Sequence, residues 1–247
     1  MNLRKKFVLL FISGCLLTML FLYWKSNDVT PTTNLHQYSE EQLLYFSDVA
    51  FGYPDKIKKW NKKVVVKIVG PCTEDDKIEV LNIIQEISAI IGKDKINFGL
   101  KDANVFVYFP NLQQDFEREK RGELNIDVNG FTFSTFSFSG YLKEVKLYIS
   151  PALKGKWRNR ILRHEFCHAL GLSGHSKKAY KEEHLLGVRL YDSLEAAEKD
   201  ELTAATIPEP DKMAIKLLYD NSIPNGLKRS KFVEYLEKHK QKERKLN

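Results

Sequence analysis

The chain has 247 residues, of which 43% are hydrophobic and 29% are charged, and its formal net charge is +7. This charge lies at the two ends, because residues 1–28 carry a net +3 and residues 228–247 a net +5, so the part between them is near neutral. No basic patch interleaved with aromatic residues occurs in that part, and the sequence therefore predicts no nucleic-acid recognition.

The N-terminus has the pattern of a membrane anchor. Basic residues at positions 4–6 precede an unbroken apolar run over residues 7–24. That length just reaches what a bilayer core requires, and the basic flank is expected to stay cytoplasmic. Residues 1–28 are therefore expected to tether the domain outside the cytoplasm, in the periplasm or at the cell surface. An alternative is a lipoprotein signal, because Ile-Ser-Gly-Cys at 12–15 resembles a bacterial processing site that leaves Cys15 lipidated.

The segments that flank the domain are expected to be simple. Residues 29–60 begin with Pro, Thr and Asn and become weakly helical over 40–49, which predicts a tether and an N-terminal extension. About 185 residues follow them, enough for one core, and the domain is expected over 61–227. Residues 228–247 are predicted to form a basic, solvated helical tail, with attraction to anionic lipid as an alternative.

The domain opens with a strand and a helix. Residues 63–69 are a β-branched run, which predicts a strand. Thr73, with Asp76 three residues later, predicts a helix N-cap, and Gly92 ends the apolar periodicity. The apolar residues at helical spacing are Ile78, Leu81, Ile84, Ile87 and Ile91. Together they predict an amphipathic helix that crosses over the sheet.

Four more strands are expected after this helix. Residues 96–100 and 105–109 are short apolar runs, and the polar residues 110–130 predict a long surface loop. Residues 131–138 alternate aromatic side chains with Ser or Thr, but the phase slips midway, which indicates a β-bulge or a bend. Alternating apolar residues over 145–149 predict the last strand.

Three of the chain's six histidines lie within residues 164–175. On a helix, His164 and His168 lie four residues apart on one face, so both imidazoles can bind a single ion. Glu165 projects beside them and can take a proton from a metal-activated water and pass it to a leaving amine. This spacing predicts a zinc hydrolase in which Zn²⁺ is the cofactor and Glu165 is the catalytic base.

A catalytic zinc site needs a third protein ligand and leaves its fourth position to water. Gly171, one turn after His168, lets the helix end in a sharp turn, because glycine reaches positive φ without steric cost. His175 can then return to the metal, and we predict it as the third ligand. His184 is the alternative.

The motif carries a resemblance to a known family. His-Glu-x-x-His-x-x-Gly at 164–171, followed by His-Ser at 175–176, resembles the metzincin zinc peptidases, and most of all their matrixin branch. The family places its third histidine three residues after the glycine, where this chain has Gly174. The run Leu-Leu-Tyr-Asp at 217–220 with Ile-Pro-Asn-Gly at 223–226 also resembles a bacterial zincin-like domain family of unassigned function, some of whose members have eroded zinc motifs.

The resemblance implies an α+β, zincin/metzincin-like fold, with a twisted mixed β-sheet of about five strands, a crossover helix, an active-site helix and a mainly helical C-terminal subdomain. It also implies that a peptide or protein substrate pairs with residues 131–138 at the edge of the sheet, although a strand that fills the core is an alternative. Metzincins keep a methionine turn beneath the metal. Here Asp-Ser-Leu at 192–194 is the candidate turn, and Met213 is expected in the core of a matrixin-like final helix.

The sequence thus favours a membrane-tethered zinc metalloendopeptidase. The alternatives are a catalytically inactive zincin-like binding or scaffold module, and a zinc amidase or other hydrolase that acts on cell-wall peptides. Cys72 and Cys167 can pair in an oxidising compartment, but Cys167 also fits as a small buried hydrophobic residue. Cleavage specificity, oligomeric state and any regulatory pro-segment stay open.

Overall fold

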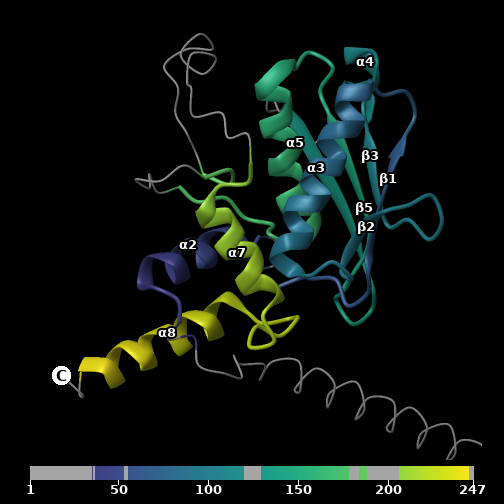
Figure 1. The fold of residues 1–247 in the computed structure, drawn as a ribbon. Helices are drawn as coiled ribbons and strands as arrows, with labels where there is room; N and C mark the ends of the chain where they lie inside the picture. Colours follow the sequence, from purple (N-terminus) through teal and green to yellow (C-terminus); the bar gives the residue numbers. More distant parts are fainter. Residues whose placement is uncertain are drawn as a thin grey trace, which may run out of the picture.

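The structure, a computed structural model, describes residues 35, 37–52, 55–119, 129–177, 184–187 and 206–244. These residues form an α+β fold with a five-stranded mixed sheet (Figure 1). The helices are α2 (Glu40–Ala50), α3 (Glu74–Ile91), α4 (Gln113–Glu119), α5 (Gly155–Leu170), α7 (Glu209–Tyr219) and α8 (Arg229–Arg244). The strands are β1 (Val64–Val69), β2 (Ile96–Phe98), β3 (Val105–Tyr108), β4 (Gly130–Phe136) and β5 (Leu142–Ile149).

The sheet has the strand order β2-β1-β3-β5-β4. β1, β2, β3 and β5 run parallel, and β4 pairs antiparallel with β5 at one edge. Helices α3 and α5 lie side by side over one face of the sheet (Figure 1). The predicted order of the five strands, the crossover helix and the helix that carries the His-Glu-x-x-His motif is confirmed. Residues 131–138 belong largely to the edge strand β4.

The predicted irregularity in the aromatic strand is also confirmed. The register between β4 and β5 shifts between Thr135 and Phe136, where β5 contains one extra residue, Lys143. Before the shift, Phe131 points into an aromatic cluster with Phe116 and Tyr148. Since side chains alternate along a strand, its neighbours at 132 and 134 point to the opposite face, toward α5.

Helix α3 begins and ends where the sequence predicts. Asp76 N donates to Thr73 Oγ1 and Thr73 N donates to Asp76 Oδ2, both at 3.1 Å, and Gly92 follows the last turn. The predicted apolar face is wrong in its first two turns, because Ile78 and Leu81 are 49% and 41% exposed. The buried face includes two carboxylates, Asp76 and Glu79, which bind arginines of α5, together with Val80, Ile83, Ile84 and Ile87. Relative to the predicted orientation, α3 is therefore rotated about its axis so that Asp76 and Glu79 face the arginines of α5.

Two segments differ from the sequence-based expectation. The predicted loop over 110–130 contains the helix α4, whose Phe116 is fully buried against β4 and β5. The predicted N-terminal extension contributes to the core through α2, in which Phe46 and Val49 are fully buried. Phe46 also contacts Phe232 of α8, with ring centroids 5.4 Å apart. The folded core thus extends beyond the range 61–227 at both ends.

Other expectations concern the termini and the cysteines. Among the helices that the structure describes, none is long and apolar enough to cross a membrane. The predicted anchor, residues 7–24, lies outside the described residues. Cys72 and Cys167 are both free, the first exposed and the second buried, so the interpretation of Cys167 as a small buried core residue is confirmed and the alternative, a disulfide with Cys72, is not formed.

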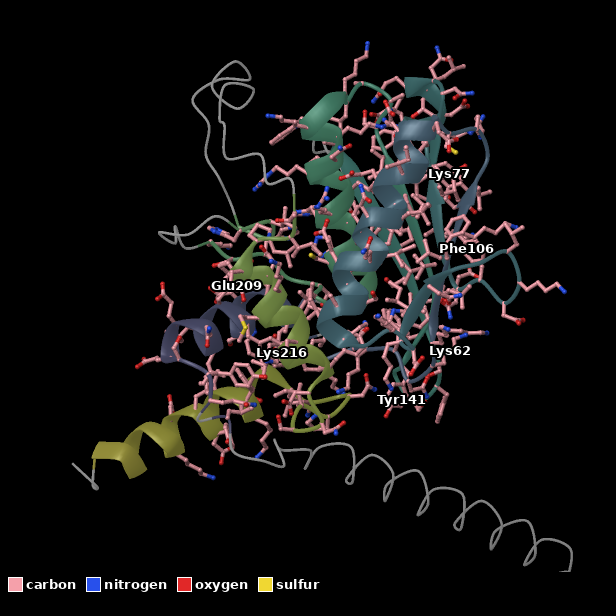
Figure 2. The ribbon with its side chains drawn as sticks, in the orientation of Figure 1. Lys62, Lys77, Phe106, Tyr141, Glu209 and Lys216 are labelled. Atoms are coloured by element: carbon pink, nitrogen blue, oxygen red, sulfur yellow. The ribbon has the colours of Figure 1, made fainter. Side chains whose placement is uncertain are left out.

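Charged side chains lie mostly at the surface, as Lys62, Lys77 and Lys216 do (Figure 2). Arg163 is different, because it is 2% exposed between α5 and α3. Its guanidinium donates to Glu79 and, at 2.7 Å, to Glu86. Glu86 also accepts from Ile207 N at 2.7 Å. This network fixes α5, the helix that carries the His-Glu-x-x-His motif, against α3.

Replacing Arg163 with alanine is expected to destabilise the fold by about 3–5 kcal/mol, because it leaves two largely buried carboxylates without their cation. Urea unfolding of both proteins measures the difference. Arg118→Ala is the control, since Arg118 pairs with Asp115 at 3.0 Å but is 73% exposed, and a change below about 0.5 kcal/mol is expected there. Equal effects for the two variants would contradict the structural role of Arg163.

Candidate metal centre

Three imidazoles converge at the C-terminal end of α5. The Nε2 atoms of His164 and His168 lie 3.0 Å apart, and the Nε2 atom of His175 lies 3.1 Å from the first and 3.2 Å from the second. Within the described residues, these three side chains are the group of His, Cys, Asp and Glu that could hold a metal ion. His184 is not part of the group. The structure therefore brings together the three histidines that the sequence predicts as ligands.

The spacing of the three nitrogens fits a small divalent cation. In a tetrahedral zinc site with Zn–N bonds of about 2.0–2.1 Å, the ligand nitrogens lie about 3.3–3.4 Å apart. The observed separations of 3.0–3.2 Å are only slightly shorter. Three neutral imidazoles are also a donor set that zinc prefers, so the residues present fit the ion.

The tautomers of the two helical histidines are fixed by backbone carbonyls. His164 Nδ1 lies 2.9 Å from Leu185 O, and His168 Nδ1 lies 2.5 Å from Leu172 O. An Nδ1–H that donates to a carbonyl leaves the Nε2 lone pair free to face the centre. Burial, with the nearby His175, lowers the pKa of His164 to about 4. Burial, with the nearby His164 and His175, lowers the pKa of His168 well below its usual value. Both rings are therefore neutral at physiological pH.

Leu185, whose carbonyl oxygen binds His164, is itself held by a buried carboxylate. Asp211 of α7 is fully buried and accepts hydrogen bonds from Leu185 N at 2.7 Å and from Tyr45 Oη at 2.6 Å. His184 lies in the same segment, is 6% exposed and packs edge-on against Tyr45. His184, the alternative third ligand, therefore lies in the segment that supports His164 and is not one of the three converging histidines.

The loop that carries His175 is anchored to α2 and to the residues that follow it. Ser176 Oγ donates to Asp48 Oδ2 at 2.7 Å, Gly174 N donates to Val49 O at 2.8 Å, and Ser173 Oγ accepts from Gly52 N at 3.0 Å. A Cβ on Gly174 would collide with the carbonyl oxygen of Asp48. These contacts fix the loop, and its side chain at position 175 points at the other two histidines.

Gly171 ends α5 with φ 114° and ψ 2°, in the left-handed region. A Cβ at this position would also collide with the carbonyl oxygen of Lys58. Gly171→Ala is therefore expected to destabilise the protein by about 2–5 kcal/mol, through backbone strain and steric overlap together. Gly226→Ala separates backbone strain from steric overlap, because Gly226 has φ +81° but open space around it. A destabilisation of about 1 kcal/mol, from backbone strain alone, is expected there. Thermal unfolding of both variants checks the difference.

Glu165 lies beside the histidines and is 4% exposed. Its Oε2 accepts from the Thr132 hydroxyl of β4 at 2.7 Å. Burial raises the pKa of Glu165 to about 8, while the Thr132 hydrogen bond acts in the opposite direction. Gly130 leaves room for this carboxylate, because a Cβ there would lie 2.9 Å from Oε1.

These side chains line one open cleft of about 320 Å³ between α5 and β4. Its walls are formed by Gly130, Phe131, Thr132, Ser134, His164, Glu165, His168, Ser173 and His175. The cleft therefore joins the predicted metal ligands, the predicted base and the edge strand. Neither Gly130 nor Thr132 belongs to a sequence motif, so their roles beside Glu165 could not be predicted from the sequence.

Two further expectations can be placed. Met213 lies in α7 and packs partly buried against the core, as predicted for the final helix. The candidate turn at 192–194 lies outside the described residues. Tyr219, also on α7, donates to Leu170 O at 2.9 Å and so supports the end of the motif helix.

Comparison with known proteins adds no relative. No model of a known protein family matches the sequence, and no curated protein matches it. The fold and the site themselves define the class: an α+β protein with a mixed five-stranded sheet and a three-histidine centre able to hold a metal ion.

Proposed function

We propose that the protein is a zinc-dependent metallopeptidase with a zincin fold of the metzincin type, tethered outside the cytoplasm by residues 1–28. The observation that carries this proposal is the convergence of three imidazole nitrogens, 3.0–3.2 Å apart, in one cleft with the buried Glu165. Structural zinc sites are usually closed by four protein ligands, whereas catalytic sites use three. Three histidines with an adjacent carboxylate therefore favour catalysis over a purely structural metal.

The reaction that this arrangement supports is hydrolysis of a peptide bond. A zinc ion held by the three histidines would polarise the peptide carbonyl and lower the pKa of a water molecule. Glu165 takes a proton from the attacking water and delivers it to the leaving nitrogen, so the products are a carboxylic acid and an amine. A cation nearby favours the ionised form of Glu165 over the protonated form that burial alone favours.

The edge strand offers a place for an extended substrate. β4 pairs on one side with β5, and within the described residues its other side pairs with no strand. An extended peptide can add to such an edge through main-chain hydrogen bonds. Thr132 and Ser134 of this strand line the cleft, so a peptide aligned along β4 passes the three histidines.

The experiment that tests this function uses the full-length chain in detergent, freed of metal with a chelator and then reconstituted with one equivalent of Zn²⁺. A peptide library analysed by mass spectrometry is expected to show cleavage at internal bonds, absent without metal and restored by zinc. Zinc binding without cleavage of any peptide would identify an inactive zincin-like module instead. Cleavage restricted to cell-wall peptides would identify an amidase or a related hydrolase.

A further inference from the structure

The carboxylate of Glu165 needs a fixed orientation, and the motif helix alone does not provide one. Glu165 directly follows His164 on α5, so its side chain leaves the helix about 100° away from the imidazole. It carries rotatable bonds that helix geometry does not lock. A general base must lie within hydrogen-bond reach of the proton it takes, so a contact outside the helix has to hold it.

That contact comes from the edge strand. The Thr132 hydroxyl donates to Glu165 Oε2 at 2.7 Å, and it also lies 3.4 Å from the backbone oxygen of the same residue. Within the described part of the chain, it is the one side chain that binds this carboxylate. Within the described residues no side chain donates to the second oxygen, Oε1, so both of its lone-pair sites are left for the proton.

The same strand makes room for Oε1, because Gly130 has no side chain. Gly130 lies beside this oxygen, and a Cβ at position 130 would lie 2.9 Å from Oε1, 3.0 Å from Glu165 Cγ and 2.8 Å from Ile161 Cγ2. Both Gly130 and Glu165 line the cleft. β4 thus supplies a hydrogen-bond donor for Oε2 and, through the missing side chain of Gly130, the room that Oε1 occupies beside the cleft.

We propose that Thr132 is the positioning residue for the catalytic base: its hydroxyl holds Oε2 of Glu165 so that Oε1 accepts the proton from water. The hydrogen bond persists after proton transfer, because a carboxylic acid protonated on Oε1 still accepts through Oε2. The inference rests on the proposed peptidase function. It also couples the strand on which a substrate would align to the group that removes the proton.

Thr132→Val is the informative variant, because valine keeps the shape and the β-branching of threonine but removes the hydroxyl. It is expected to lower kcat by about 10- to 100-fold with KM within about twofold, as expected for a displaced catalytic group. Thr132→Ser keeps the hydroxyl and is expected to retain kcat within about threefold. Zinc affinity, measured by competition with a chromophoric chelator, is expected to stay unchanged in both variants.

Thr206→Val is the matched control, because it makes the same change at a threonine outside β4. Thr206 is exposed and is not among the residues that line the cleft. Kinetics equal to the wild type are expected there. In a Glu165→Ala background, Thr132→Val is expected to cause no further loss of the residual activity, because residues that act together are not additive.

The outcomes separate two failures. A wild-type protein that binds zinc but cleaves no peptide overturns the peptidase function and the role of Thr132 with it. An active wild-type protein whose Thr132→Val variant keeps its kcat overturns the role of Thr132 alone. The same holds if Thr132→Ser is as impaired as Thr132→Val, or if Thr132→Val lowers activity further without Glu165.

Discussion

Replacing Glu165 with glutamine is expected to lower kcat for peptide hydrolysis by about 10²- to 10⁴-fold. Glutamine has nearly the same shape, so it fits beside Gly130 and can still accept a hydrogen bond from Thr132 through its amide oxygen. It cannot take a proton from water. The loss should therefore appear in kcat, with little change in KM, and steady-state kinetics on a peptide from the library measure both.

Zinc binding decides what such a loss means. His164 and His168 keep their carbonyl contacts in Glu165→Gln, and the three histidines keep their mutual geometry, so the stoichiometry of one Zn²⁺ per chain is expected to stay unchanged. Removing a buried ionisable group from an apolar setting is also expected to leave the fold intact, which thermal unfolding checks. A variant that binds zinc and hydrolyses peptides at the wild-type rate would exclude Glu165 as the base.

The sequence predicts the parts of this protein that depend on local spacing. The capping pair of Thr73 and Asp76, the end of α5 at Gly171 and the histidine pair one turn apart all follow from interactions over a few residues. The order of strands follows from alternation and β-branching for the same reason. These elements are confirmed because their geometry depends mainly on residues that are close in sequence.

The sequence does not predict the parts that depend on distant contacts. α4 has the composition of a loop and becomes a helix where Phe116 meets β4 and β5. α2 resembles an extension, but its Asp48 and Val49 hold the loop of the third histidine. Thr132 meets Glu165 across 33 residues of sequence. Hydroxyl and carboxylate residues at such separations carry no periodic signal.

Replacing His175 with alanine is expected to weaken zinc binding by more than about 100-fold. Changing a residue that only hydrogen-bonds to a metal ligand costs about 10- to 100-fold in affinity, and loss of the ligand itself should cost more. His175 is exposed and lies on a loop held by backbone and serine contacts that the change leaves in place. The metal-free protein is therefore expected to keep its stability. Chelator competition measures the affinity, and peptide cleavage should be lost at zinc concentrations that saturate the wild type.

His184→Gln tests the rival ligand in the same assay. His184 is buried against Tyr45 in the segment that Asp211 holds, so its replacement is expected to lower the stability of the fold and to leave one zinc bound per chain. The two variants are therefore expected to have opposite effects. His175→Ala loses the metal and keeps its stability, whereas His184→Gln loses stability and keeps the metal. If His175→Ala retained wild-type affinity while His184→Gln lost it, the third donor would come from the supporting segment, and the cleft between α5 and β4 would no longer hold a three-histidine centre.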